Sequence, residues 1–233
     1  MNRLLLLLLA IFTTLNLSAQ SAGIELNLGY GFYEMDSFKK LLDYYKSESG
    51  LTYKQLSNYE PDINLGGTFV VGVGKFETGL DYRYFKTEGE LQSDDNGRIS
   101  GVKFDAVSHA LGLFGRHPVI YSKKFQLKLG ALASVNSSKA GLTEYSVAAN
   151  VRQENMREII SKSIVVTGTL EPVYYITGGV YFGLRAGYAY DFTGALHEKK
   201  DVDKKLVLDP GDEVRTNWTG IRTDFFIGLR LNP

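Results

Sequence analysis

The chain has no cysteine and no net charge. Without a cysteine in 233 residues, it can form neither a disulfide framework nor a thiolate metal site. Its 26 basic and 26 acidic side chains balance, so charge gives no reason to expect a nucleic-acid partner. Only three histidines occur, at scattered positions, and we expect no metal and no cofactor. Stability must come from backbone pairing and packing.

Long apolar runs are also absent after the first residues. Residues 1–19 contain Arg3, a short leucine-rich stretch and small residues before Gln20, which is the layout of a secretory signal peptide cleaved near Ala19. The following chain has no apolar run of about 18 residues, so spanning helices are not expected. Residues 20–233 contain no proline- or serine-rich linker, and we expect one domain. Only a closed barrel could then cross a membrane, because hydrocarbon requires every backbone group to be paired.

What the chain does contain is apolar and polar alternation with a period of two, which predicts strands. The predicted strands are 23–33, 62–73, one starting after a turn at 74–75, 102–116, 125–135, 163–176, 180–192 and 216–231. In the fourth, Val102 and Phe104 fall on one parity, whereas Leu111 and Leu113 fall on the other. A β-bulge near Asp105 would explain this switch.

The connections between these eight segments alternate between long and short. The long ones are 34–61, 87–101, 136–162 and 193–215, and the short ones are 74–75, 117–123 and 177–179. All long connections therefore lie at one end of an up-and-down meander. This asymmetry is typical of outer-membrane barrels, which have short periplasmic turns and long external loops.

Two of the long connections are predicted to be partly helical. Residues 37–46 place four apolar side chains on one helical stripe, and residues 151–162 form a weaker candidate. The stripe consists of Phe38, Leu41, Leu42 and Tyr45. It could pack on the protein's own loops over the barrel mouth, or it could dock a partner in the same membrane.

The strand faces opposite to the apolar ones carry mixed charges and many glycines. A narrow eight-stranded barrel has an interior that side chains fill, and glycines there make room for long charged residues to pair. We therefore predict an outward apolar face toward lipid and a salt-bridge network in the lumen. Its expected members are Glu77, Asp81, Arg83, Lys128, Glu171, Arg185, Arg222, Asp224 and Arg230.

The hairpin turns predict which residues lie opposite each other. A turn centred on residue 178 places Glu171 opposite Arg185 on the polar face, and Tyr174 opposite Phe182 on the apolar face. A turn at 74–75 places Phe69 opposite Leu80 and Thr68 opposite Asp81. In both hairpins the polar and apolar parities agree.

Four stretches carry a resemblance to a known family: "LSAQ", "GIELNLGYGF", "GGVYFGLRAGYAYDF" and "FFIGLRLNP". With them the sequence resembles small eight-stranded outer-membrane β-barrel proteins of the OmpA/OmpX type, most closely the Bacteroidota porin-family barrels called PorT-like. The resemblance covers nearly the whole mature chain and implies an all-β, antiparallel up-and-down transmembrane barrel in the outer membrane. The family's assembly signal ends in an aromatic residue, whereas this chain ends in Asn232 and Pro233.

Catalytic residues are hard to find. Ser108 and His109 form the only adjacent serine–histidine pair, and neighbours on a strand point to opposite faces, so they form no nucleophile–base dyad. We expect a non-enzymatic barrel whose external loops serve as a structural or protein-interaction surface. A small channel or transport component is the alternative, followed by a lipid-modifying enzyme. The expected partners are outer-membrane lipid and another envelope protein, without nucleic acid.

Overall fold

The structure is a computed structural model that describes residues 21–48, 52–59, 62–95, 98–148, 151–177, 179–192, 194–199, 201–207 and 213–231. The expected signal peptide, its cleavage near Ala19 and the central residue of the predicted turn at 178 lie outside these ranges. The elements are β1 Ser21–Tyr33, α2 Asp36–Glu48, β2 Lys54–Asn58, β3 Asp62–Val73, β4 Phe76–Asp95, β5 Arg98–Tyr121, β6 Phe125–Ala148, β7 Val151–Thr177, β8 Val180–Phe192, β9 His197–Glu198, β10 Asp201–Lys205 and β11 Gly220–Leu231. Within these ranges, no helix is long and apolar enough to cross a membrane.

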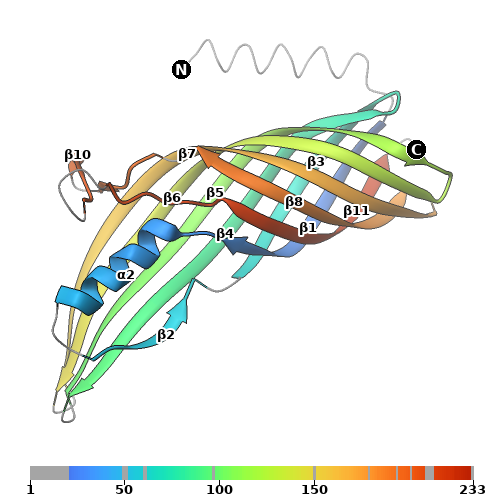
Figure 1. The fold of residues 1–233 in the computed structure, drawn as a ribbon. Helices are drawn as coiled ribbons and strands as arrows, with labels where there is room; N and C mark the ends of the chain where they lie inside the picture. Colours follow the sequence, from blue (N-terminus) through green and yellow to red (C-terminus); the bar gives the residue numbers. More distant parts are fainter. Residues whose placement is uncertain are drawn as a thin grey trace.

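Eight of the strands close into an antiparallel ring (Figure 1). β1 pairs with β3 on one side and with β11 on the other, and the sheet runs from β3 through β4, β5, β6, β7 and β8 back to β11. The predicted antiparallel eight-stranded barrel is confirmed. The registers expected at the turns are also found, with Phe69 opposite Leu80 and Tyr174 opposite Phe182.

The ring is polar inside and apolar outside. On β1, Leu26 is 67% exposed, whereas the neighbouring Glu25 is 1% exposed. On β8, Phe192 is exposed on the outer wall while Arg185 is buried in the lumen. Because strand side chains alternate between faces, each strand delivers one polar set to the lumen and one apolar set to the outer wall.

Four strands continue well past the ring. β4, β5, β6 and β7 contain 20, 24, 24 and 27 residues, and Figure 1 shows them reaching beyond the barrel as one curved sheet. We call residues 86–107 and 139–160 of this sheet, with α2, β2 and β9, the extension. β2 pairs with β4 at one edge of the extension, and β9 pairs with β7 at the other.

The extension corrects three expectations. We expected residues 87–101 and 136–162 to be loops, but every described residue in these ranges belongs to one of the four long strands. The helix predicted at 151–162 is wrong, because this segment pairs with β6 from Ala148 opposite Val151 onward. The bulge predicted near Asp105 is also wrong, because β5 keeps an unbroken register there with both neighbours.

The parity switch in β5 reflects a change of surroundings. Phe104 and Ala106 point inward and are fully buried, whereas Leu111 and Leu113 point outward and are exposed. Around the ring, the lumen holds charges and the apolar residues face out. In the extension, the inner face of the sheet holds an apolar cluster, so the apolar residues face in.

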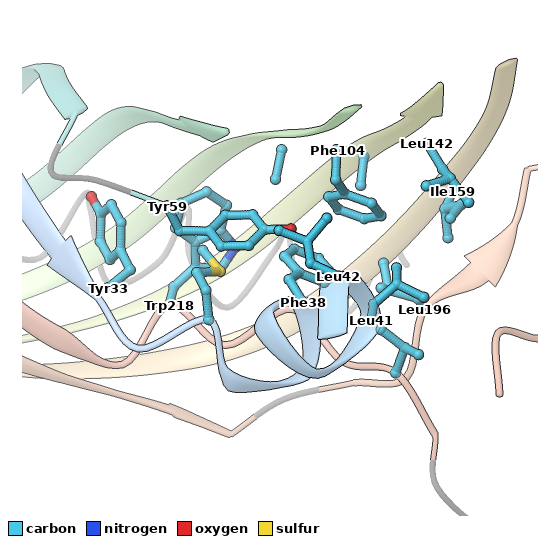
Figure 2. Close-up of a cluster of buried hydrophobic side chains, with 14 of the residues drawn as sticks. Tyr33, Phe38, Leu41, Leu42, Tyr59, Phe104, Leu142, Ile159, Leu196 and Trp218 are labelled. Atoms are coloured by element: carbon cyan, nitrogen blue, oxygen red, sulfur yellow. The ribbon is translucent and has the colours of Figure 1, made fainter. Parts of the chain in front are cut away.

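Helix α2 covers this inner face (Figure 2). The helix predicted at 37–46 is found at Asp36–Glu48. Phe38, Leu41 and Leu42 are buried in the apolar cluster, where the Phe38 ring lies 4.1 Å from that of Phe104 between centroids. Tyr45 is half-buried, and its hydroxyl donates a hydrogen bond to Glu144 at 2.7 Å. The stripe thus packs on the protein's own extension and is not presented as a surface for a partner.

Candidate functional site

The centre of the lumen is one arginine that bridges three strands. The Arg116 guanidinium, from β5, lies 2.5 Å from Glu25 of β1, 2.6 Å from Glu77 of β4 and 2.7 Å from Glu171 of β7. Arg116 and Glu25 are 1% exposed. Gly130 on β6 makes room for this side chain, because a Cβ there would lie 3.0 Å from the Cβ of Arg116.

A second arginine extends the network. The Nε of Arg185 lies 2.7 Å from Glu171, and its Nη2 lies 3.0 Å from Glu25. The two residues predicted to face each other across the β7–β8 hairpin therefore form an ion pair. Glu25 also accepts a hydrogen bond of 2.9 Å from the hydroxyl of Tyr181. The carboxylate oxygens at the centre are thus shared between two guanidinium groups.

Two further groups of charges flank this centre. Toward the turn end, Glu77 accepts hydrogen bonds from Lys128 at 2.8 Å and from Arg230. Toward the extension, Arg83 binds Asp81 at 2.8 Å and also pairs with Asp224. Five carboxylates and five cations are therefore paired inside the ring. They are Glu25, Glu77, Asp81, Glu171 and Asp224 with Arg83, Arg116, Lys128, Arg185 and Arg230.

Arg222 is the expected member that lies apart from this network. In the described part of the chain it pairs with no carboxylate. Instead its guanidinium lies 4.3 Å from the ring centroid of Phe85 and donates a hydrogen bond to the carbonyl of Trp218 at 3.3 Å. Arg222 therefore sits where the ionic lumen meets the apolar cluster of the extension, with a cation–π contact in place of an ion pair.

The sequence reasoning missed Arg116. Its strand has an ambiguous parity, so the sequence pattern does not show which face of that strand is polar. One signal was available: Val102 and Phe104 have the same parity as Arg116, and continuing that parity down β5 without a bulge points Arg116 into the lumen. Glu25 lies on the polar face of the first predicted strand, although the predicted network does not include it.

In the described part of the chain, side chains fill most of the lumen around Arg116. The cavity beside Arg116, Arg83 and Asp224 has a volume of about 20 Å³, which is room for about one water molecule. Apart from Arg222, the charges named above are paired and hydrogen-bonded, which offsets the loss of their hydration. The arrangement is therefore that of a neutral plug of cross-strand ion pairs that ties the wall of the barrel together.

Ser108 and His109 lie on opposite faces of β5. Ser108 is buried, and its hydroxyl bonds that of Ser138 at 3.0 Å. His109 is exposed on the outer wall, where its Nδ1 lies 2.8 Å from the hydroxyl of Tyr82. The two side chains therefore cannot exchange a proton, as a nucleophile and its base must.

Charged side chains cover the outer face of the extension. Lys103 donates to Glu88 at 3.1 Å, and this hydrogen bond raises the pKa of the Lys103 ammonium. Burial raises the pKa of the Asp105 carboxyl, with Glu88 adding to the effect. Ion pairs this exposed contribute little to stability, about 0–1 kcal/mol each. These pairs keep the outer face hydrated, and the rigidity of the extension comes from its strand pairing and its apolar cluster.

Comparison with known proteins gives matches of fold only. No family model and no curated protein matches the chain. Among solved structures, Ail, the attachment invasion locus protein of Yersinia pestis, in complex with the heparin analogue sucrose octasulfate, is 10% identical, with a TM-score of 0.42, over 90% of this chain and 99% of that one. The outer membrane protease OmpT from Escherichia coli is 9% identical, with a TM-score of 0.36, over 90% and 96%. Values this low transfer no ligand and no activity.

Proposed function

We propose that the protein is a non-enzymatic integral outer-membrane barrel whose extension is a rigid external surface for structural or protein–protein contacts. The observation that carries the proposal is the inverted polarity of the ring, with Arg116 buried and Leu26 exposed. Water would hydrate such charges and expel such an apolar wall, whereas lipid favours this arrangement. The closer affiliation with the small Bacteroidota barrels stays a prediction.

The height of the apolar wall supports a membrane-spanning position. On β6 the wall covers residues 125–135, which at about 3.4 Å per residue and a tilt of about 40° gives about 26 Å along the barrel axis, close to the band of about 25 Å in outer-membrane barrels. Aromatic side chains are exposed at both edges. They include Tyr30, Phe32, Tyr188, Tyr190 and Phe192 at one end, and Phe76, Tyr121, Phe125 and Tyr174 at the other.

The filled lumen favours a structural role over transport. Ion flow needs a continuous water-filled path, whereas the network around Arg116 crosses the lumen and leaves a cavity of only about 20 Å³. The separation of Ser108 from His109 favours a protein without nucleophilic catalysis. The ordered core of the extension favours a contact surface of fixed shape, about 30 Å long on strand 139–148 at about 3.4 Å per residue.

The membrane assignment is tested by extraction and folding. We expect the protein to stay in the membrane fraction through salt and carbonate washes and to dissolve only in detergent. In the detergent-folded state it should migrate faster on a gel before boiling than after, because a closed barrel resists the denaturing detergent. Release by carbonate alone would overturn the proposal.

The absence of transport and of catalysis is tested separately. The purified barrel should give no conductance in planar bilayers, and lipid A from a deletion strain should be unchanged. Steady conductance that disappears when the lumen is blocked at the level of Arg116 would make the protein a channel. Altered lipid A, restored by the intact gene, would make it a lipid-modifying enzyme.

A further inference from the structure

The apolar wall of the ring has a furrow on one side. The furrow has a volume of about 470 Å³ and runs over β4, β5 and β6. Its lining includes Leu80, Tyr82, His109, Leu113, Ala133 and Ser137. Since all of these point outward, the furrow opens to lipid if the proposed membrane position is right, and the inference that follows rests on that position.

Two short side chains of β6, one on each side of Val135, lie between longer neighbours on the adjacent strands and deepen the furrow there. Ala133 lies between Leu113 on β5 and Val166 on β7, and Ser137 lies between His109 and Lys162. On β6 the lining of the furrow runs from Ala133 through Val135 to Ser137, a span of about 14 Å at about 3.4 Å per residue. An apolar groove of this length matches part of an extended acyl chain.

The mouth of the furrow carries positive charge. Lys162 lies directly opposite Ser137, and Lys139 follows two residues further along β6 on the same face. Such diagonal neighbours lie about 7–8 Å apart. Both lysines are exposed, and in the described residues neither pairs with a carboxylate. Two carboxylates, Asp105 and Glu158, are diagonal neighbours of Lys139 on the extension side and line a cavity with it; Glu158 is bound to Lys199 at 2.5 Å.

A polar pair completes the mouth. The hydroxyl of Tyr82 lies 2.8 Å from the Nδ1 of His109. With the tyrosine hydroxyl as donor, the Nε2–H of the ring remains as a donor for a ligand. Two ammonium groups and an imidazole N–H thus lie at the edge of an apolar groove, where phosphate oxygens would accept charge-assisted hydrogen bonds.

We propose that this furrow is a binding site for a phosphorylated lipid of the outer leaflet, with an acyl chain along β6 and the phosphate on Lys139 and Lys162. The chemistry that selects this occupant is the combination of an apolar groove with unpaired cations at its membrane-surface end. A neutral lipid would use only the groove, and a free phosphate would use only the lysines. The site is distinct from the lumen network and from the inner face of the extension.

Native mass spectrometry of the detergent-folded barrel tests the site. The probes are dimyristoyl phosphatidic acid, dimyristoyl phosphatidylcholine and inorganic phosphate. We expect phosphatidic acid to be retained best, and a Lys139→Gln/Lys162→Gln variant to lose about fivefold in retention for each lysine. Retention of phosphatidylcholine should change little in that variant. The matched control is Lys123→Gln/Lys124→Gln, which removes two lysines at the opposite end of the barrel.

A second variant tests the groove. Ala133→Leu should lower the retention of both lipids, whereas Ala186→Leu on the outer face of β8 should lower neither. Equal retention of phosphatidic acid in all variants would overturn the proposal, as would inorganic phosphate displacing it completely. Two measurements on each variant separate the lipid site from the membrane position. A variant that keeps its gel-mobility shift but shows no selective lipid retention refutes only the lipid site. Release of the protein by carbonate refutes the membrane position itself.

Discussion

The ring and the extension belong to one sheet but have opposite polarity. Within the ring the enclosed face holds Arg116, Arg185 and their carboxylate partners, and the outer face is apolar. In the extension the enclosed face holds Phe38, Phe104 and their apolar neighbours, and the outer face is charged. The alternation of polar and apolar residues therefore places the polar set on the enclosed face in the ring and the apolar set there in the extension. The surroundings of the outer face decide which set is enclosed.

The two regions are also stabilised differently. The apolar cluster contributes about 25 cal/mol for each Å² of apolar surface removed from water. Burying the charges of the ring costs free energy of hydration, and their close pairing offsets this cost. Removing one member of a pair is destabilising mainly because the other member stays charged and buried. Substitution of a core side chain by alanine should therefore destabilise the ring and the extension in different ways.

The largest effect is expected from Arg116→Ala. It leaves Glu25, Glu77 and Glu171 without their shared guanidinium, and should lower the free energy of unfolding by about 3–5 kcal/mol. Urea unfolding in detergent, followed by the gel-mobility shift, measures it. The control is Arg152→Ala, whose pair with Glu154 is 58% and 48% exposed and contributes about 0–1 kcal/mol. Similar losses of stability in both variants would contradict the conclusion that Arg116 holds the three glutamates together.

Phe38→Ala extends this comparison to the other core. The lost packing should cost about 3 kcal/mol, but it should loosen only the extension. Limited proteolysis is expected to cut the extension while the ring keeps its gel-mobility shift. Loss of the shift would mean that the ring depends on the extension for its stability.

A charge placed on the outer face should separate the two regions next. Leu28→Arg puts a cation on the apolar wall of β1 and should cost about 2–4 kcal/mol. Met156→Arg puts the same cation on an exposed outward position of the extension, where Met156 is 59% exposed, and should change stability by about 0.5 kcal/mol or less. Urea titration of both variants gives the difference, and equal costs would show that both outer faces meet the same medium.

The smallest effect concerns pH and only the extension. Burial raises the pKa of Tyr145 to about 12, and the Glu90 carboxylate, which accepts its hydroxyl at 2.8 Å, adds to this. A tyrosine with a raised pKa stabilises the fold while protonated, so its contribution is full below about pH 10 and is lost as the pH rises toward the folded value. Limited proteolysis of the extension, with the cutting rate at each pH divided by that of an unfolded peptide substrate, should become faster over that range, and Tyr145→Phe should reduce the increase. The same increase in the variant would assign it to other groups.

The ring was predictable because its alternation, its turns and its outward apolar face all agree. Register followed from turn position alone, as Thr68 opposite Asp81 shows. The extension was not predictable in the same way, because the polarity rule of the ring does not hold for residues 136–162. Once the apolar parity reverses, as it does between Val107 and Phe104, a strand resembles a loop with scattered apolar residues. The same reversal of parity on β5 hides Arg116 as a lumen residue in the sequence.

The unbroken ladder between β4 and β5 has a mechanical consequence. Pairing runs from Glu77 opposite Arg116 to Asp95 opposite Arg98 without a shift in register. Because the wall and the projection share these hydrogen bonds, there is no hinge between them along these strands. A sideways force on the extension is therefore transmitted as torque to the whole ring. The direction in which the extension points also indicates how the ring is tilted.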